Sequence, residues 1–273
     1  MTGHDRREEL RAQLEQTKAQ FEATSAKIEK KAGRNIFLAI GSGLIFGAVF
    51  LGSLFFIEQV FILFLAVLLS IALIELAGAF RVAGRRVPRV GVVLGGLIIV
   101  GGAYLWGAEG MLLGLFAGSV LLTIWRLVEG LVPQWEVPRK TLVRDVFSGL
   151  FSLVYVPFLG SYTVLLVQGE RGEWWVFAMV LTVVSTDVGA YAAGVTLGKH
   201  KMTPRISPNK TWEGFAGAAV LAVVAGVIIS ILALEQPWWV GVVLGLVVLL
   251  TATGGDLTES LIKRNLGVKD MST

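Results

Sequence analysis

Apolar segments of about 20 residues recur along this chain, and each is long enough to cross ~30 Å of hydrocarbon as a helix. Hydrophobic residues make up 55% of the 273 residues and charged residues only 16%, whereas a soluble domain carries about 25% charged residues. The sequence therefore predicts an all-α, polytopic integral membrane protein with about eight transmembrane helices. We expect the spans at residues 35–57, 59–80, 90–107, 110–132, 143–167, 174–197, 212–234 and 238–258.

The basic residues fall on alternate connections between these spans. If the N-terminus lies in the cytoplasm, all of the 24 Lys and Arg residues except Arg171 fall in cytoplasmic segments. Cytoplasmic segments carry the excess of basic residues in membrane proteins, and one missed span would destroy this asymmetry. We therefore expect a cytoplasmic N-terminus, a location in the cytoplasmic (inner) membrane, and an active site that faces the cytoplasm.

Charge and hydropathy divide the chain into three regions. Residues 1–34 are charged with a thin apolar stripe, which predicts a cytoplasmic amphipathic N-terminal helix, either on a surface or in a short coiled coil. Residues 35–172 hold N-terminal transmembrane helices for packing, with paired glycines and a kink expected at Pro157. Glu75 in this region is either a structural hydrogen-bonding group or the edge of a site. Residues 173–273 hold the informative chemistry.

Carboxylates are the metal ligands that the composition leaves open. The chain has no cysteine, and its two histidines are too few for a histidine-based metal cluster. Asp187 lies in the sixth expected span and Asp256 in the eighth, both in the cytoplasmic half at depths of ~20 Å and ~27 Å. An ionised carboxylate at such depth is costly unless it is paired or bound to a metal. The geometry allows one site shared by two helices. The alternatives are a protonated Asp187 bonded to a neighbouring helix and an Asp256 that belongs to an ordinary charged helix end.

Each of the two acids shares a helix face with other polar or small residues. Asp187 lies on one face with Tyr191 and Gly194, at i, i+4 and i+7. Asp256 begins a second stripe, bordered by Arg264, that continues through Glu259, Ser260 and Lys263. Carboxylates followed by bases within two helical turns suit a divalent cation that holds a phosphate.

The cytoplasmic loop 198–212 joins the sixth and seventh spans. It carries four basic residues, Lys199, Lys201, Arg205 and Lys210. Thr211 is placed to cap the seventh span, whose first turn favours anions. The positive-inside bias alone would account for these basic residues. The segment Ser-Pro-Asn-Lys-Thr-Trp-Glu-Gly, however, has a more specific residue pattern than membrane topology requires.

Two segments carry extended motifs. The pattern Ser-x-Ile-Lys-Arg-x-x-x-x-Lys-Asp-x-Ser begins at Ser260 within the C-terminal segment 254–273. The pattern Asp-x-Gly-Ala-Tyr begins at Asp187 and is followed by Gly-Lys-His-Lys and Ser-Pro-x-Lys-Thr-Trp-Glu-Gly. The first pattern resembles the signature, and the second resembles the other characteristic region, of phosphatidate cytidylyltransferases, also called CDP-diacylglycerol synthases. The family signature continues beyond Thr273, so we expect this sequence to be a piece of a longer chain.

The resemblance implies an enzyme that makes CDP-diacylglycerol and pyrophosphate from CTP and phosphatidate at the bilayer. It implies Mg²⁺ as cofactor and no nucleic acid partner. Whether a second cation binds, and whether the protein forms homo-oligomers, stays open. The implied metal ligands are Asp187, Asp256 and Asp270, and the catalytic residues are these three and Lys263. The implied substrate-binding residues are Lys199, Arg205, Ser207, Asn209, Lys210, Thr211, Glu259, Ser260, Arg264 and Lys269.

Two other functions are compatible with intramembrane carboxylates. A CTP-dependent polyprenol or phytol kinase also joins a cytosolic nucleotide to a membrane lipid, but it requires a general base for the alcohol. A membrane transporter typically shows inverted repeats with broken helices in both halves. Here the polar chemistry is concentrated in the last third of the chain, which favours an enzyme.

Overall fold

The computed structural model describes residues 36–131 and 139–268. Within these ranges six helical segments are long and apolar enough to cross a membrane. They are α3 (Glu58–Val82), α4 (Arg89–Gly130), the segment Lys140–Val167, α7 (Gly172–Leu197), α8 (Trp212–Leu232) and α9 (Trp238–Leu266). The predicted helical membrane protein is thereby confirmed. The helix expected over 1–34 lies outside the described residues.

The chain divides into two compact units, residues 1–57 and 58–273. In the first unit the described element is α2 (Ile36–Phe56), which includes a shorter apolar helical segment over Gly41–Phe56. The second unit contains all the other elements that the structure describes, and the packing and the sites described below belong to it.

Helix α4 consists of two halves that fold back on each other. The backbone leaves helical geometry at Trp106 and at Gly107, whose φ is 60°. Beyond this turn the halves pack glycine against glycine, so a Cβ placed on Gly102 would lie only 2.2 Å from the carbonyl oxygen of Gly110. Only glycine permits so close an approach of two helix backbones. The predicted spans 90–107 and 110–132 correspond to these two halves.

The segment Lys140–Val167 is a single span with a widened turn. Helix α5 (Arg139–Leu153) passes into a π-helical turn, η2 (Val154–Phe158), and then into α6 (Leu159–Val167). Pro157 lies in the π turn. Proline has no N–H to donate and its ring crowds the preceding turn, and a π turn is one way a helix absorbs such a disturbance. The irregularity predicted at Pro157 takes this form.

A buried ion pair joins α4, α5 and the turn between α3 and α4. The side chains of Arg126 and Asp145 are 1% and 0% exposed, and Arg126 Nη2 donates to Asp145 Oδ2 at 2.8 Å. The other carboxylate oxygen accepts the backbone N–H of Arg86 at 3.0 Å. Removing one partner of such a pair leaves a buried charge and costs about 3–5 kcal/mol, so this contact fixes the turn.

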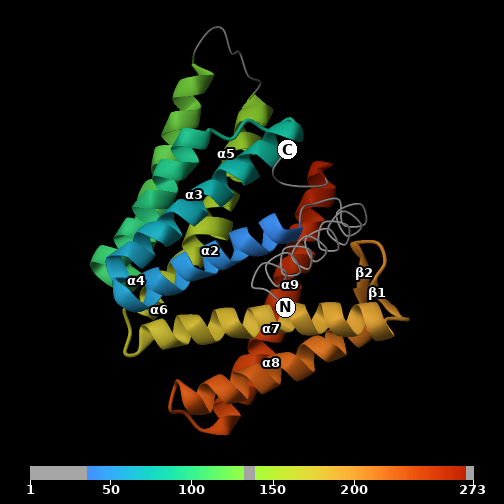
Figure 1. Ribbon diagram of the computed structural model, residues 1–273. Coiled ribbons are helices and arrows are strands. Elements are labelled where there is room, and N and C mark those ends of the chain that lie inside the picture. The colour runs from blue at the N-terminus through green and yellow to red at the C-terminus, as the bar shows by residue number, and fades with distance from the viewer. Residues whose placement is uncertain (1–35, 132–138, 269–273) are drawn as a thin grey trace, which may run out of the picture. The chain divides into compact units, whose positions relative to one another are not determined.

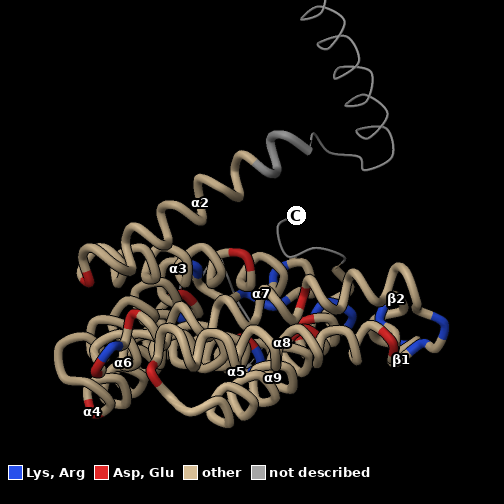
Figure 2. Tube along the Cα trace, turned by 60° about the horizontal axis from the view of Figure 1, so that its bottom comes forward, with Lys and Arg blue, Asp and Glu red and all other residues tan. Residues whose placement is uncertain are grey.

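Helices α7, α8 and α9 form the other part of the second unit, where α7 and α8 lie side by side (Figure 1). Between them the chain forms an antiparallel hairpin of β1 (Lys201–Thr203) and β2 (Ser207–Thr211), with Lys201 opposite Thr211. These two short strands occupy the region predicted as a loop. Figure 2 shows Lys and Arg gathered at this hairpin, which carries Lys201, Arg205 and Lys210.

Candidate active site

The site begins with the close packing of α7 on α8. A Cβ placed on Gly189 would lie 2.5 Å from the carbonyl oxygen of Gly217, so the two backbones are in contact at this point. Gly189 is two residues after Asp187. The contact therefore fixes the height and rotation of Asp187 relative to the start of α8.

The β1–β2 hairpin is fastened to the first turn of α8. Thr211 is the N-cap of α8, and its Oγ1 accepts the backbone N–H of Gly214 at 3.1 Å, which confirms the predicted cap. The carboxylate of Glu213 accepts the backbone N–H of Lys199 at 3.1 Å and lies 2.6 Å from Nδ1 of His200. The chain before β1 and the chain after β2 are thus held at the same helix end.

A second fastening joins the hairpin to α9. Arg264 Nε donates to the backbone carbonyl oxygen of Ile206 at 2.7 Å. Ile206 lies in the turn between β1 and β2. Because the guanidinium comes from the last turn of α9, the hairpin is held between the start of α8 and the end of α9.

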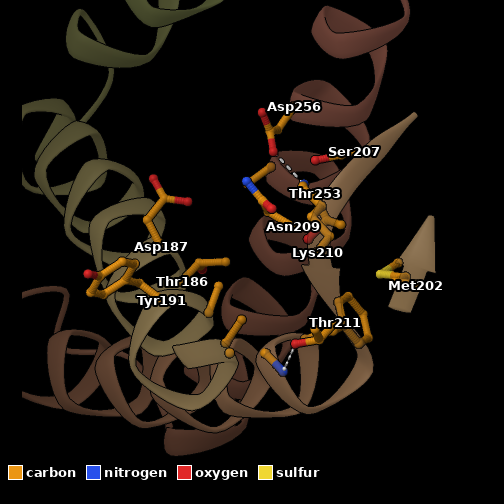
Figure 3. A pocket seen from close by; sticks show the side chains of 16 residues that line it. Thr186, Asp187, Tyr191, Met202, Ser207, Asn209, Lys210, Thr211, Thr253 and Asp256 are labelled. Atoms are coloured by element: carbon orange, nitrogen blue, oxygen red, sulfur yellow. Dashed lines mark hydrogen bonds and ion pairs between the residues drawn. The ribbon is translucent and has the colours of Figure 1, made fainter. Parts of the chain in front are cut away.

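A cavity of about 310 Å³ lies between the hairpin and the helices α7, α8 and α9. Its lining includes Asp187 from α7 and Asp256 from α9, and the two carboxylates occupy facing walls in Figure 3. The β2 strand supplies the polar residues Ser207, Asn209, Lys210 and Thr211. Tyr191 and Gly194 of α7, which are predicted to share a helix face with Asp187, also line this cavity.

Two ion pairs lie in and beside this cavity. Lys210 Nζ forms an ion pair with Asp256 Oδ2 (Figure 3). One turn further along α9, Lys263 Nζ lies 2.6 Å from Glu259 Oε1. The exposed carboxylate of Asp187 has no hydrogen-bond or ionic partner among the residues that the structure describes. Asp187 is therefore the acid most available to a cation.

A larger cavity of about 750 Å³ adjoins the same two acids from the other side. Asp187, Ala252 and Asp256 line both cavities. The other lining residues are mainly apolar and come from α6, α7 and α9: Leu166, Trp175, Met179, Val183, Leu244, Val247 and Val248. The acids thus separate a polar cavity below the hairpin from an apolar one between membrane-spanning helices.

The remaining predicted site residues lie at different distances from these cavities. Glu259 lines the apolar cavity, and Lys263 is its ion-pair partner. Ser260 is half-buried on the next position of α9. Lys199 and Arg205 are exposed on or before the hairpin and line neither cavity. Lys269 and Asp270 lie outside the described residues. Glu75 is exposed on α3 and lines neither cavity.

Several residues of the site were missed by the sequence reasoning, among them Thr253, Glu213 and Ile206. Thr253 lies three residues before Asp256 and lines the polar cavity, so the i, i+3 spacing was a usable signal. Glu213 follows the N-cap Thr211 in the first turn of α8, where acids are favoured. Ile206 contributes through its backbone carbonyl, and no side-chain pattern reports such a contact.

The donor set fits a hard divalent cation whose remaining ligands come from elsewhere. No group of three or more His, Cys, Asp or Glu side chains suited to a metal occurs within residues 36–131 and 139–268. Mg²⁺, however, usually keeps several waters and takes one or two carboxylates together with substrate phosphates. Asp187 and Asp256, with the nearby amide of Asn209 (Figure 3), match that requirement.

Comparison with known proteins agrees with this geometry. Residues 38–273 match the cytidylyltransferase family. A phosphatidate cytidylyltransferase of Mycobacterium bovis is 38% identical over 250 residues, which cover 88% of this chain and 80% of the relative. Its namesake in Mycobacterium tuberculosis is also 38% identical, with 88% of this chain and 75% of the relative covered. The namesake in Mycobacterium leprae is 37% identical over 249 residues, or 88% and 80% of the two chains. A match over this much of the sequence makes the chain a member of the cytidylyltransferase family.

Proposed function

We propose that this protein transfers the cytidylyl group of CTP to phosphatidate and releases pyrophosphate. One observation carries the proposal: two acids from different helices and Lys210 meet in a polar cavity that adjoins an apolar one. A charged nucleotide and a lipid phosphate can approach the same two carboxylates from these two sides. The relatives that bear the name phosphatidate cytidylyltransferase support this substrate pair.

The reaction requires positioning and charge neutralisation more than proton transfer. A phosphate oxygen of phosphatidate forms a bond to the α-phosphorus of CTP, and the bond from that phosphorus to the bridging oxygen of the β-phosphate breaks. Pyrophosphate leaves with the electron pair. Because the attacking oxygen is already anionic, no serine–histidine pair is needed, and in-line alignment and electrostatic stabilisation supply most of the rate.

Each residue of the site has a role in that scheme. Asp187 and Asp256 would hold Mg²⁺, which supplies charge neutralisation at the phosphates when it is bound. Lys210 and Lys263 are the cations that phosphate oxygens would meet, from the hairpin and from α9. Ser207 and Asn209 present hydrogen-bonding groups from β2. Arg264 keeps the hairpin over the cavity through its bond to Ile206.

We further propose eight spans with the N-terminus in the cytoplasm of a cell bounded by an inner membrane. The two halves of α4 are each long enough to count as one span, and α2 supplies another. With this topology the basic hairpin and the polar cavity face the cytoplasm, where CTP is present. The placement of Lys and Arg, with Arg171 alone on the other side, supports this orientation.

Position-specific labelling of CTP tests the proposed reaction. Membranes that contain the protein are incubated with phosphatidate and CTP labelled either in cytidine or at the γ-phosphate. Nucleotidyl transfer places the cytidine label in the lipid fraction and the γ label in pyrophosphate. A γ label in the lipid would indicate a lipid kinase, and CTP that remains intact would favour a transporter; either result would overturn the proposal.

A further inference from the structure

A basic cavity lies away from Asp187 and Asp256, at the junction of α3, α4 and the turn between them. Its volume is about 780 Å³. Four arginines and one glutamate are the charged residues of its lining, Arg81, Arg86, Arg89, Arg126 and Glu129. It shares no lining residue with the polar or the apolar cavity of the active site. The positive-inside bias requires basic residues in this turn, but it does not require them to line a cavity.

The arginines of the turn divide into two groups with different contacts. Arg85 Nη1 donates to Ser148 Oγ at 3.2 Å, and Arg144 Nη2 from α5 donates to the carbonyl oxygen of Gly84 at 2.7 Å. These guanidiniums hold the turn against α5. By contrast, the exposed side chains of Arg81, Arg86 and Arg89 line the cavity, and within the described residues no acidic side chain forms an ion pair with them.

The floor of this cavity is rigid. Arg126 is buried and bonded to Asp145, which also accepts the backbone N–H of Arg86 at 3.0 Å. The position of the Arg86 backbone is therefore fixed independently of its side chain. Glu129 accepts Trp125 Nε1 at 3.0 Å and forms an ion pair with Arg126 at 3.9 Å, so its charge is already paired on the rim. The backbone that carries the exposed arginines is therefore held in place, which reduces the ordering cost of binding to that of their side chains.

The place of the cavity in the fold selects a lipid as its occupant. Arg81 lies in the last turn of α3 and Arg89 begins α4, so the cavity lies where two spans meet the membrane surface. Trp125 and the exposed Val90 border it, and aromatic residues favour this interfacial depth. Guanidiniums bind phosphate oxygens in bidentate geometry.

We propose that the exposed guanidiniums of Arg81, Arg86 and Arg89, above the buried Arg126–Asp145 pair, bind the phosphate headgroup of an anionic phospholipid at a site separate from the catalytic cavity. The lipid phosphate lies among the guanidiniums, and the acyl chains continue along the apolar surface of α4. An inorganic phosphate carries the same charged group but lacks the chains, so it binds more weakly.

Titration of the purified full chain in neutral detergent tests this site. The midpoint of thermal unfolding is followed against dihexanoyl phosphatidylglycerol, dihexanoyl phosphatidylcholine and inorganic phosphate, since a ligand of the folded state raises that midpoint. Phosphatidylglycerol should stabilise the wild type at concentrations where the other two compounds do not. Arg86→Gln should weaken its binding about fivefold and Arg86→Gln/Arg89→Gln about 25-fold, because each basic side chain contributes about 1 kcal/mol at an anionic lipid surface.

Lys140→Gln is the matched control, because it removes an exposed charge at the start of α5 that lines none of these cavities. Its affinity for phosphatidylglycerol should equal that of the wild type. Arg86→Gln keeps the backbone bond to Asp145, so it preserves the fold even if the double variant does not. Equal binding of phosphatidylglycerol by the wild type and Arg86→Gln would overturn the site. Equal binding of phosphatidylcholine by the wild type would overturn the assignment of an anionic headgroup, and equal binding of inorganic phosphate would overturn the assignment of a lipid.

Discussion

Replacement of Asp256 by asparagine should remove turnover while leaving the fold almost unchanged. The substitution keeps the size of the side chain and removes its charge. In the structure the carboxylate pairs with Lys210, and the two side chains are 57% and 23% exposed. An ion pair that accessible contributes about 0–1 kcal/mol to stability. Loss of one preorganised electrostatic group at a reacting centre costs about 3–4 kcal/mol, or roughly 10²–10³-fold in kcat. Activity should therefore fall far more than stability.

Transfer of cytidine label into lipid measures kcat, and thermal unfolding of the same detergent-solubilised preparation measures stability. Glu235→Gln is the matched control, because it removes the carboxylate of another exposed ion pair, with Arg171 at 2.9 Å, outside both active-site cavities. The control should retain both activity and unfolding temperature. Near-normal turnover in Asp256→Asn would exclude Asp256 from the site. A large fall in unfolding temperature would show that the residue acts on the fold.

Three further substitutions test two contacts of the fold and the bond that positions the hairpin. Gly102→Ala should destabilise the turn-back of α4 by more than about 1 kcal/mol, because its Cβ would lie 2.2 Å from a backbone oxygen. Gly101→Ala is the control: an added Cβ there has nothing within 4 Å, so thermal unfolding should show a neutral or stabilising effect. Asp145→Asn should cost about 3–5 kcal/mol of unfolding free energy, because the buried charge of Arg126 loses its 2.8 Å carboxylate partner and keeps only the longer 3.9 Å contact with Glu129; an unfolding curve like that of the wild type would contradict this. Arg264→Gln should raise KM for CTP with little change in unfolding temperature, because it frees the hairpin from α9; unchanged KM would show that the bond does not position the hairpin.

The span pattern could be read from the sequence because membrane helices are specified by local composition. The ~20-residue apolar segments and the basic connections between them need no tertiary information. The cap at Thr211 was also local, since a threonine before an apolar run satisfies free N–H groups at a helix start. The shared face of Asp187, Tyr191 and Gly194 followed from helical periodicity alone, and all three line the polar cavity.

Contacts between distant segments could not be read in this way. The strands at Lys201–Thr203 and Ser207–Thr211 are short, and Pro208 within the second is a poor signal for a strand. Arg264 is predicted to bind phosphate because it is a base, and nothing in the sequence indicates that its Nε also donates to a backbone carbonyl 58 positions away in the chain. In the sequence, Arg126 counts only as one of the basic residues that indicate the cytoplasmic side. Its burial against Asp145 depends on how α4 and α5 pack.

Binding of Mn²⁺, a paramagnetic substitute for Mg²⁺, tests the central claim that Asp187 and Asp256 hold one cation together. Electron paramagnetic resonance gives the free Mn²⁺ during titration of the purified protein without any need for turnover. Asp187→Asn and Asp256→Asn should each abolish the same tight site, and the double variant should lose no more than either single variant. Wild-type Mn²⁺ affinity in either single variant would contradict a shared site.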